Sequence, residues 1–147
     1  MRAALPLLVV LLSTSVSAAE WLKVADLGAD GSLIAVDRSG IARTNKVRKA
    51  WFKSTYKKPQ RIPDGVPKAD PNEFYYSESI ALYYFICTER MTGSTQAIYR
   101  DAAGKVVATY EDRNPFPHYS DVAPETIGEM MLNVACGWKF PGDAAKK

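Results

Sequence analysis

The stretch SESIALYYFICTERM, residues 77–91, is the most strand-like part of this chain. Aromatic and β-branched residues dominate it, and successive side chains of a strand point to opposite faces of a sheet. One face would carry Ala81, Tyr83, Phe85 and Cys87, and the other Ile80, Leu82, Tyr84 and Ile86. Because both faces are apolar, we expect a central strand that is covered on at least part of each side.

Shorter strands are predicted on both sides of this stretch, separated by turns that contain glycine. The strand patterns cover residues 20–26, 33–37, 47–56, 95–100 and 105–111. The dipeptides Asp30-Gly31, Ser39-Gly40 and Gly93-Ser94 are the predicted turns. Short turns between successive strands favour an antiparallel sheet, here of five or six strands.

One helix is predicted near the C-terminus. Thr126 and Glu129 have the spacing of a capping box, in which the threonine caps the helix and the glutamate reaches back to its amide. Gly137 predicts that the helix ends around Cys136. An apolar stripe at i, i+3, i+4 and i+7 would pack on the sheet through Ile127, Met130, Met131 and Val134. The fold class is therefore α+β, mainly β, with a C-terminal helix packed on one face of the sheet.

The two cysteines, Cys87 and Cys136, predict a disulfide between the central strand and this helix. A metal site would need further cysteine or histidine ligands, and His118 is the only histidine. A catalytic thiol would need a basic partner. Closing a loop of roughly 50 residues would stabilise the fold by ~4 kcal/mol in the chain-entropy account.

The first residues have the pattern of a secretory signal peptide. Arg2 precedes an apolar run from Leu5 to Leu12, and small residues follow up to Ala19. We expect residues 1–18 to be the signal peptide, with cleavage after 18 or 19, and residues 19–147 to form a single domain. The run is too short to cross ~30 Å of hydrocarbon, so no membrane span is expected. Because the protein would leave the cytoplasm, nucleic acid is excluded as a partner.

Basic residues are concentrated in one segment, although the net charge is only +3. Nine basic side chains and no acidic one lie between Arg38 and Arg61. We predict a surface that binds a protein, or an anionic glycan or envelope polymer, through Arg48, Lys49, Trp51, Lys53, Lys57 and Lys58. The alternative is a solvated strand face whose lysines keep a sheet edge from aggregating.

Motifs for catalysis are weak. Ser54 and Lys57 match the Ser-x-x-Lys pattern of penicillin-interacting enzymes, but that motif works at a helix start and this one lies on a predicted strand. His118, Ser120 and Asp121 are the residue types of a hydrolase triad, but near neighbours in one loop seldom reach triad geometry. Phosphate-loop and calcium-loop spacings are absent from the sequence. We expect no catalysis, no cofactor and no metal.

Prolines recur every four residues from Pro59 to Pro71 and predict an extended, stiff loop. An alternative function follows from it, because a protruding loop can enter a cleft of another protein. The chain would then be a periplasmic inhibitor or accessory protein of a cell-envelope enzyme. A homodimer formed through a sheet edge is also compatible with the sequence.

The order of landmarks along the chain resembles the surface-adhesin protein E-like family of small exported bacterial proteins. The resemblance covers about residues 20 to 137. Its landmarks are EWLKV at 20–24, Val36-Asp37, VRKAWFKSTYKKPQ at 47–60, Tyr76-Ser77, YFIC at 84–87, PETI at 124–127 and Cys136.

The resemblance implies an antiparallel sheet and a C-terminal helix joined to it by a disulfide. It also implies non-catalytic binding of host or envelope components at a bacterial surface. The family's founding member is a lipoprotein, whereas no cysteine follows the predicted signal peptide here. We therefore expect a periplasmic or secreted protein.

Overall fold

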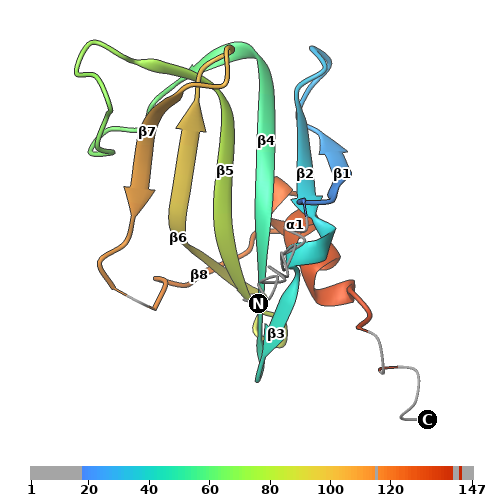
Figure 1. Cartoon of the computed structure of the whole chain (residues 1–147). Coiled ribbons are helices and arrows are strands. Elements are labelled where there is room, and N and C mark those ends of the chain that lie inside the picture. Colours follow the sequence, from blue (N-terminus) through green and yellow to red (C-terminus); the bar gives the residue numbers. More distant parts are fainter. Residues whose placement is uncertain (1–17, 115, 141–142, 144–147) are drawn as a thin grey trace, which may run out of the picture.

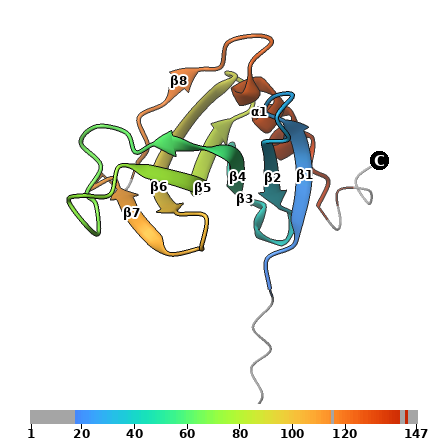
Figure 2. The same ribbon diagram turned by 90° about the horizontal axis from the view of Figure 1, so that it is seen from above.

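A curved antiparallel sheet with one helix against it makes up the computed structural model (Figures 1 and 2), which describes residues 18–114, 116–140 and 143. The predicted signal peptide falls almost wholly outside these residues. The strands are β1 (Trp21–Asp26), β2 (Leu33–Asp37), β3 (Ala42–Thr44), β4 (Val47–Arg61), β5 (Tyr75–Ile86), β6 (Met91–Arg100), β7 (Val106–Glu111) and β8 (Ser120–Asp121). The 3-10 turn η1 (Arg38–Gly40) follows β2, and the helix is α1 (Ile127–Gly137).

The sheet runs in the order β1-β2-β4-β5-β6-β7, and every pairing is antiparallel. These six strands correspond to the predicted sheet, and β5 is central in it. Two short strands that the sequence does not predict bring the total among the described residues to eight: β3 pairs with β4, and β8 pairs with β6. The fold class inferred from the sequence is confirmed.

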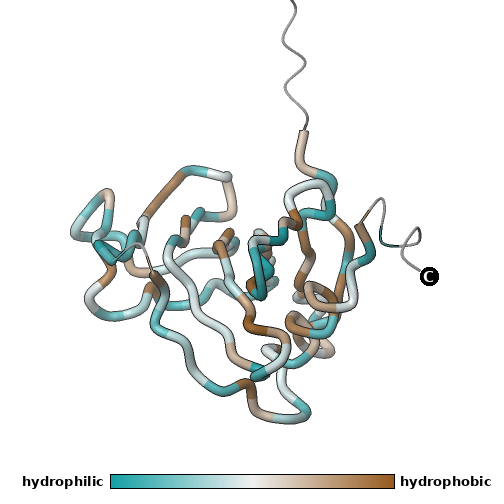
Figure 3. Tube along the Cα trace, turned by 90° about the horizontal axis from the view of Figure 1, so that it is seen from below, coloured by the Kyte–Doolittle hydropathy of each residue, from teal (hydrophilic) through white to brown (hydrophobic). Residues whose placement is uncertain are grey.

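The helix packs on the sheet face that carries Tyr83 and Phe85, which we call the helix face. Phe85 is fully buried, and the rings of Phe52 and Tyr83 meet edge to face with centres 5.9 Å apart. The rest of this core comes from β2, β4 and α1, including Val36, Ala50, Met131, Leu132 and Ala135. In Figure 3 the tube through β2 and α1 carries many of the hydrophobic residues.

The buried stripe of α1 differs from the predicted one. Met131, Leu132 and Ala135 are buried, whereas Ile127 and Met130 are exposed at 43% and 38%. The spacing i, i+3, i+4 and i+7 is kept, but it starts at Gly128, so the helix is rotated by one residue. A Cβ at Gly128 would lie 3.6 Å from Val122, so the start of this stripe packs against the segment after β8.

The helix cap forms as predicted, with one difference. Thr126 Oγ1 accepts a hydrogen bond from the Glu129 amide at 3.3 Å. Glu129 Oε2 accepts from the amide of Glu125 at 2.8 Å rather than from the amide of Thr126. Glu129 also pairs with Arg90, which ties the helix start to the turn after β5. The Glu125 amide, followed by Arg90, lowers the pKa of the Glu129 carboxyl.

The predicted turn at Gly93-Ser94 is wrong, because both residues lie within β6. The chain instead reverses over residues 87–90, where Arg90 adopts a φ of +53°. A Cβ at Gly93 would lie 2.6 Å from the carbonyl oxygen of His118. This glycine is thus required for close approach of another segment and not for a turn.

The predicted proline loop is shorter and better anchored than expected. Strand β4 continues to Arg61, through Pro59. Beyond it, Ile62 is buried, the Ala69 amide donates to the Val107 carbonyl, and the Thr109 amide donates to the Pro67 carbonyl. The segment therefore lies along the outer edge of β7 (Figure 1) and gives that strand a partner.

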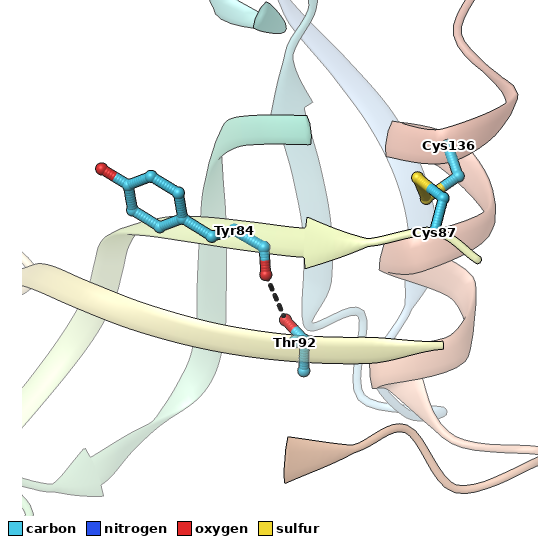
Figure 4. Close-up of a disulfide and its surroundings, with 4 residues drawn as sticks. All are labelled: Tyr84, Cys87, Thr92 and Cys136. Carbon is cyan, nitrogen blue, oxygen red and sulfur yellow. Dashed lines mark hydrogen bonds between the residues drawn. A yellow bond between two sulfur atoms is a disulfide. The ribbon is translucent and has the colours of Figure 1, made fainter. Parts of the chain in front are cut away.

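Cys87 and Cys136 form the predicted disulfide (Figure 4), with their Cα atoms 5.7 Å apart. Cys87 follows the last residue of β5, and Cys136 lies in the last turn of α1. Nearby, the Thr92 hydroxyl donates to the Tyr84 carbonyl at 3.2 Å, joining β6 to β5. The bond holds the helix against the end of the central strand.

Candidate binding surfaces

The predicted binding residues on β4 are divided between the two faces of the sheet. We call them the strip: Arg48, Lys49, Trp51, Lys53, Lys57 and Lys58. Ala50 and Phe52 belong to the helix-face core, so their neighbours Lys49, Trp51 and Lys53 point to the opposite side. We call this second side the open face. In the described residues no helix or strand packs over it (Figure 1), and it includes Lys49, Trp51, Lys53, Ile80, Leu82, Tyr84, Gln96, Ile98, Thr109 and Glu111.

The three strip residues on the open face lie in the middle of the sheet. Cross-strand neighbours are Lys49 with Tyr84, Trp51 with Leu82, and Lys53 with Ile80. Lys53 Nζ also lies 4.5 Å from the centre of the Trp21 ring, an arrangement in which the ring face attracts the ammonium. Among the ion pairs of the described residues, none includes Lys49 or Lys53.

Arg48 stands apart from this group, because it lies on the helix-face side of β4. Its guanidinium carbon is 4.6 Å from the centre of the Phe140 ring, and Arg43 approaches the same ring at 5.0 Å. Burial, and then the charge of Arg43, lowers the Arg48 pKa. Arg48 thus packs the segment after α1 onto the sheet.

Lys57 and Lys58 lie at the far end of β4, beside the turn between β1 and β2. The pairing of β4 with β5 is irregular between Thr55 and Gln60. Here the Lys57 amide donates to the Ser32 hydroxyl at 3.1 Å. Lys58 lies close enough to Asp30 to lower the pKa of that carboxyl, although the Ser32 amide has the larger effect. Both lysines are exposed.

Two shallow hollows border the strip residues on the open face. One, of about 310 Å³, lies between Trp51 and the strands β6 and β7. The other, of about 280 Å³, is lined by Lys49, Tyr84, Phe116 and Tyr119 among others. Phe116 is 74% exposed, the largest exposure among the bulky apolar residues that the structure describes. An aromatic side chain so exposed, next to a free lysine, is typical of an interaction surface.

A third hollow, of about 400 Å³, lies on the helix face, farther along β4 and β5 than the core residues Phe52 and Phe85. We call it the tyrosine hollow. All its lining residues are uncharged: Ser54, Tyr56, Val66, Tyr76, Ser79, Ala81, Tyr83, Ser94, Ala97, Tyr99 and Tyr110.

Strand register explains the shape of the tyrosine hollow. Ser54 pairs with Ser79, and Ala81 pairs with Ala97, so small side chains form a continuous floor across three strands. Tyrosines stand around this floor. The Tyr76 ring meets Tyr56 and Tyr99 edge to face, with centres 5.6 and 4.9 Å apart.

Three of the phenols in this hollow, those of Tyr76, Tyr83 and Tyr99, have a raised pKa. Burial raises the pKa of Tyr76, and the neighbouring Tyr56 raises it further. Burial is also the main cause of the raised pKa of Tyr83 and of Tyr99. The hollow therefore offers neutral hydroxyl groups that both donate and accept hydrogen bonds.

The sequence analysis missed this hollow. A signal was present, because residues 77, 79 and 81 are small and alternate with larger residues before Tyr83. Such a pattern marks a strand face without a packed layer over it. The tyrosines that surround the floor come from separate strands, and their convergence follows only from the register.

The weak catalytic motifs are not assembled into a site. Ser54 lines the tyrosine hollow, whereas Lys57 lies beside Gly31. Ser120 and Asp121 form the short strand β8, so their side chains alternate in direction. In residues 18–114, 116–140 and 143, no three histidine, cysteine or acidic side chains cluster as metal ligands would. No helix of that same part is long and apolar enough to cross a membrane.

Comparison with known proteins supports the resemblance seen in the sequence. The profile of one family, described as surface-adhesin protein E, matches residues 21–137. One crystal form of Haemophilus influenzae protein E is 12% identical, with 71% of this chain and 80% of that chain covered and a TM-score of 0.50. Another structure of Haemophilus influenzae protein E is 12% identical and has a TM-score of 0.48; the match covers 71% of this chain and 76% of that chain. A comparison with curated proteins found no match.

Proposed function

Because the chain belongs to the surface-adhesin protein E family, we propose that it is an exported, non-catalytic protein that binds a protein partner on its open face. The observation that carries this proposal is the position of Lys49, Trp51 and Lys53. They lie side by side on a sheet face that no helix or strand of the described residues covers. Family membership supports an adhesin-like role, and the open face supplies a surface suited to it.

The chemistry of the open face favours a partner with an acidic surface. Trp51, Tyr84 and Phe116 supply aromatic anchors, which carry a large share of the binding energy in many interfaces. Lys49 and Lys53 are without carboxylate partners in the described residues, so they are available to acidic groups on another protein. Anionic glycans or envelope polymers offer the same charge but fewer apolar groups for the aromatic anchors.

Export is part of the proposal. The disulfide fits a protein that matures in an oxidising compartment. Fractionation of cells that express the untagged protein, with surface protease digestion, distinguishes a periplasmic from a surface-exposed or secreted protein. Recovery at the surface or in the medium directs the search to host matrix and serum proteins. Confinement to the periplasm directs it to envelope proteins and excludes direct host adhesion.

Binding itself is tested with charge and anchor variants against the proteins of the indicated compartment. Trp51→Ala and the double variant Lys49→Glu/Lys53→Glu are expected to lose binding. Lys105→Glu, at an exposed lysine in the turn before β7, reverses one charge outside the strip; as the control for charge reversal it should bind as the unaltered protein does. Equal loss in Lys105→Glu would indicate a nonspecific charge effect, and unchanged binding in Trp51→Ala would remove the open face as the site.

The alternative, an enzyme inhibitor that inserts the proline loop, is less favoured by the geometry. Hydrogen bonds from Ala69 and to Pro67 hold that segment along β7, and the Ile62 amide donates to the Phe74 carbonyl. The tip around Asp64 and Gly65 is exposed, and Asp64 pairs with Arg61 at 3.6 Å. Loss of binding on replacing Asp64, with the open-face variants unaffected, would favour the alternative.

A further inference from the structure

We infer that the tyrosine hollow is a second binding site, and that its ligand is a short neutral saccharide. The hollow is on the helix face and the proposed protein-binding surface is on the open face; of the lining residues, Ala97 and Tyr110 also border the hollow beside Trp51. Its volume of about 400 Å³ falls in the ~300–1,000 Å³ range of small-ligand pockets. One or two sugar rings fit this space better than an extended polymer.

The walls match the two chemical characters of a sugar. A sugar ring has a C–H surface that rests on the electron-rich face of an aromatic ring, and hydroxyl groups around its edge. Tyr99 and Tyr110 offer aromatic rings on one side of the floor. The hydroxyls of Ser54 and Ser79 offer hydrogen-bonding groups within that floor.

The absence of charge in the lining selects against ionic ligands. Every lining residue is uncharged, and the raised pKa values keep Tyr76, Tyr83 and Tyr99 neutral at neutral pH. A carboxylate, phosphate or ammonium group would lose hydration on entering without gaining a counter-charge. A neutral saccharide has no charge to desolvate, and the serine and tyrosine hydroxyls of the lining can exchange hydrogen bonds with its hydroxyl groups.

A peptide is disfavoured because the adjacent strand edge is already occupied. Peptides that bind beside a sheet commonly pair with a free edge strand. Here the outer edge of β7 pairs with the chain around Lys68, through a bridge to Ala108. Val66, from the same segment, closes one side of the hollow. The site therefore offers side chains but not an unpaired backbone.

The test is a titration followed by amide chemical shifts in nuclear magnetic resonance spectra of the disulfide-bonded protein. One probe is the β1,4-linked disaccharide of N-acetylglucosamine, which has the linkage of cell-wall glycan without its carboxylate groups, and another is N-acetyllactosamine, as in animal glycoproteins. We expect saturable shifts at Ser79, Ala97 and Tyr99 with at least one of them. The disaccharide that binds more tightly indicates whether the natural saccharide is of envelope or host type.

A matched pair of variants sharpens the test. Tyr99→Phe keeps the ring and deletes a hydroxyl from a residue that lines the tyrosine hollow and not the hollow beside Trp51, and Tyr75→Phe deletes the hydroxyl of a 57% exposed tyrosine outside both. Loss of one hydrogen bond should weaken binding ~3–10-fold in Tyr99→Phe, whereas Tyr75→Phe should bind as before. If Tyr99→Phe does not fold, Ser79→Ala replaces it, because that change deletes a hydroxyl from the floor of the same hollow.

Three outcomes would overturn the inference. These are absence of saturable shifts with either disaccharide, shifts confined to the open face, and tighter binding of the neutral peptide acetyl-trialanine amide or of a sialylated trisaccharide. Because Tyr99 lines the tyrosine hollow and not the hollow beside Trp51, failure here leaves the protein-binding proposal untouched. Failure of the Trp51→Ala experiment likewise leaves the saccharide site standing.

Discussion

The two halves of the helix face use the same strands but have opposite characters. Under α1, strand β4 presents Phe52 and β5 presents Phe85, and both side chains are buried. On the same face, Ser54 lies two residues after Phe52 on β4, and Ser79 lies six residues before Phe85 on β5. There the hollow takes the place of the core. The contrast teaches that side-chain size, together with the position of the covering helix, decides where a sheet face becomes core and where it stays accessible.

The largest difference between the halves is expected on truncating a core ring. Phe85→Ala should lower the free energy of unfolding by ~3–5 kcal/mol, because it leaves a cavity between β5 and α1. Urea unfolding measures it. Tyr110→Ala, at the rim of the hollow, is the comparison and should cost ~1 kcal/mol or less. Similar losses in both variants would contradict the division into core and hollow.

Removing the disulfide tests what holds the helix over its half of the face. The double variant Cys87→Ala/Cys136→Ala should lose ~2–4 kcal/mol of unfolding free energy, since the unfolded chain loses a constraint that spans 49 residues. Intact mass with and without reductant should differ by about 2 Da in the unaltered protein. An unchanged unfolding midpoint would mean that core packing alone holds α1.

Alkaline pH should destabilise the half of the helix face that contains the tyrosine hollow. The pKa values of Tyr76, Tyr83 and Tyr99 are raised in the folded state, mainly by burial. A raised folded-state pKa means that stability is complete below the unfolded value of about 10 and declines as pH rises above it. Unfolding midpoints measured across that range should fall, and Tyr76→Phe should fall less steeply. Equal slopes for the two proteins would contradict this assignment.

A smaller effect is expected at the start of the helix. Thr126→Ala removes the acceptor for the Glu129 amide and should cost ~1 kcal/mol in thermal or urea unfolding. Thr126→Ser, which keeps the hydroxyl, is the matched control and should stay close to the unaltered protein. If both variants lose the same amount, the threonine methyl group and not the cap would be responsible.

The smallest effect is expected in the floor of the hollow. Ser79→Ala removes a hydroxyl from a space that side chains do not fill, so the unfolding free energy should change by no more than ~0.5 kcal/mol. Saccharide binding, measured by the same titration as above, should nevertheless weaken. A large loss of stability would show that the Ser79 hydroxyl stabilises the fold, which would weaken the case that it serves to bind a ligand.

Much of the fold was predictable because strong local signals agree with it. The alternation in residues 80–86 indicated a central strand, Thr126 indicated the helix start, and the two cysteines indicated the bond between them. The prediction was wrong at Gly93, where the glycine permits contact with His118. The prediction was also wrong for the apolar stripe of the helix. Ile127 and Met130 are as apolar as Leu132 and Ala135, so hydrophobicity alone could not show which pair would be buried.

The candidate sites were less predictable than the fold. The strip from Arg48 to Lys58 was apparent as a charge pattern, and its role in binding stays a prediction. Arg48 lies on the opposite face from Lys49 and packs against Phe140, a contact between residues distant in sequence. The charge pattern along a strand does not show which residues of other segments will pack beside each charged side chain, and therefore which charges stay available to a ligand.

By itself, the sequence determined the class of fold, the central strand, the helix cap, the cysteine pair and the family resemblance. These features depend on the chemistry of residues close to one another in the chain, or on the count of a rare residue. Tertiary structure alone decided how β4 divides its charges and where the helix stops covering the sheet. It also brought Ser54, Ser79 and Tyr99 together. The physical reason is that a period of two assigns residues to a face within one strand, whereas register and packing choose the neighbours on that face.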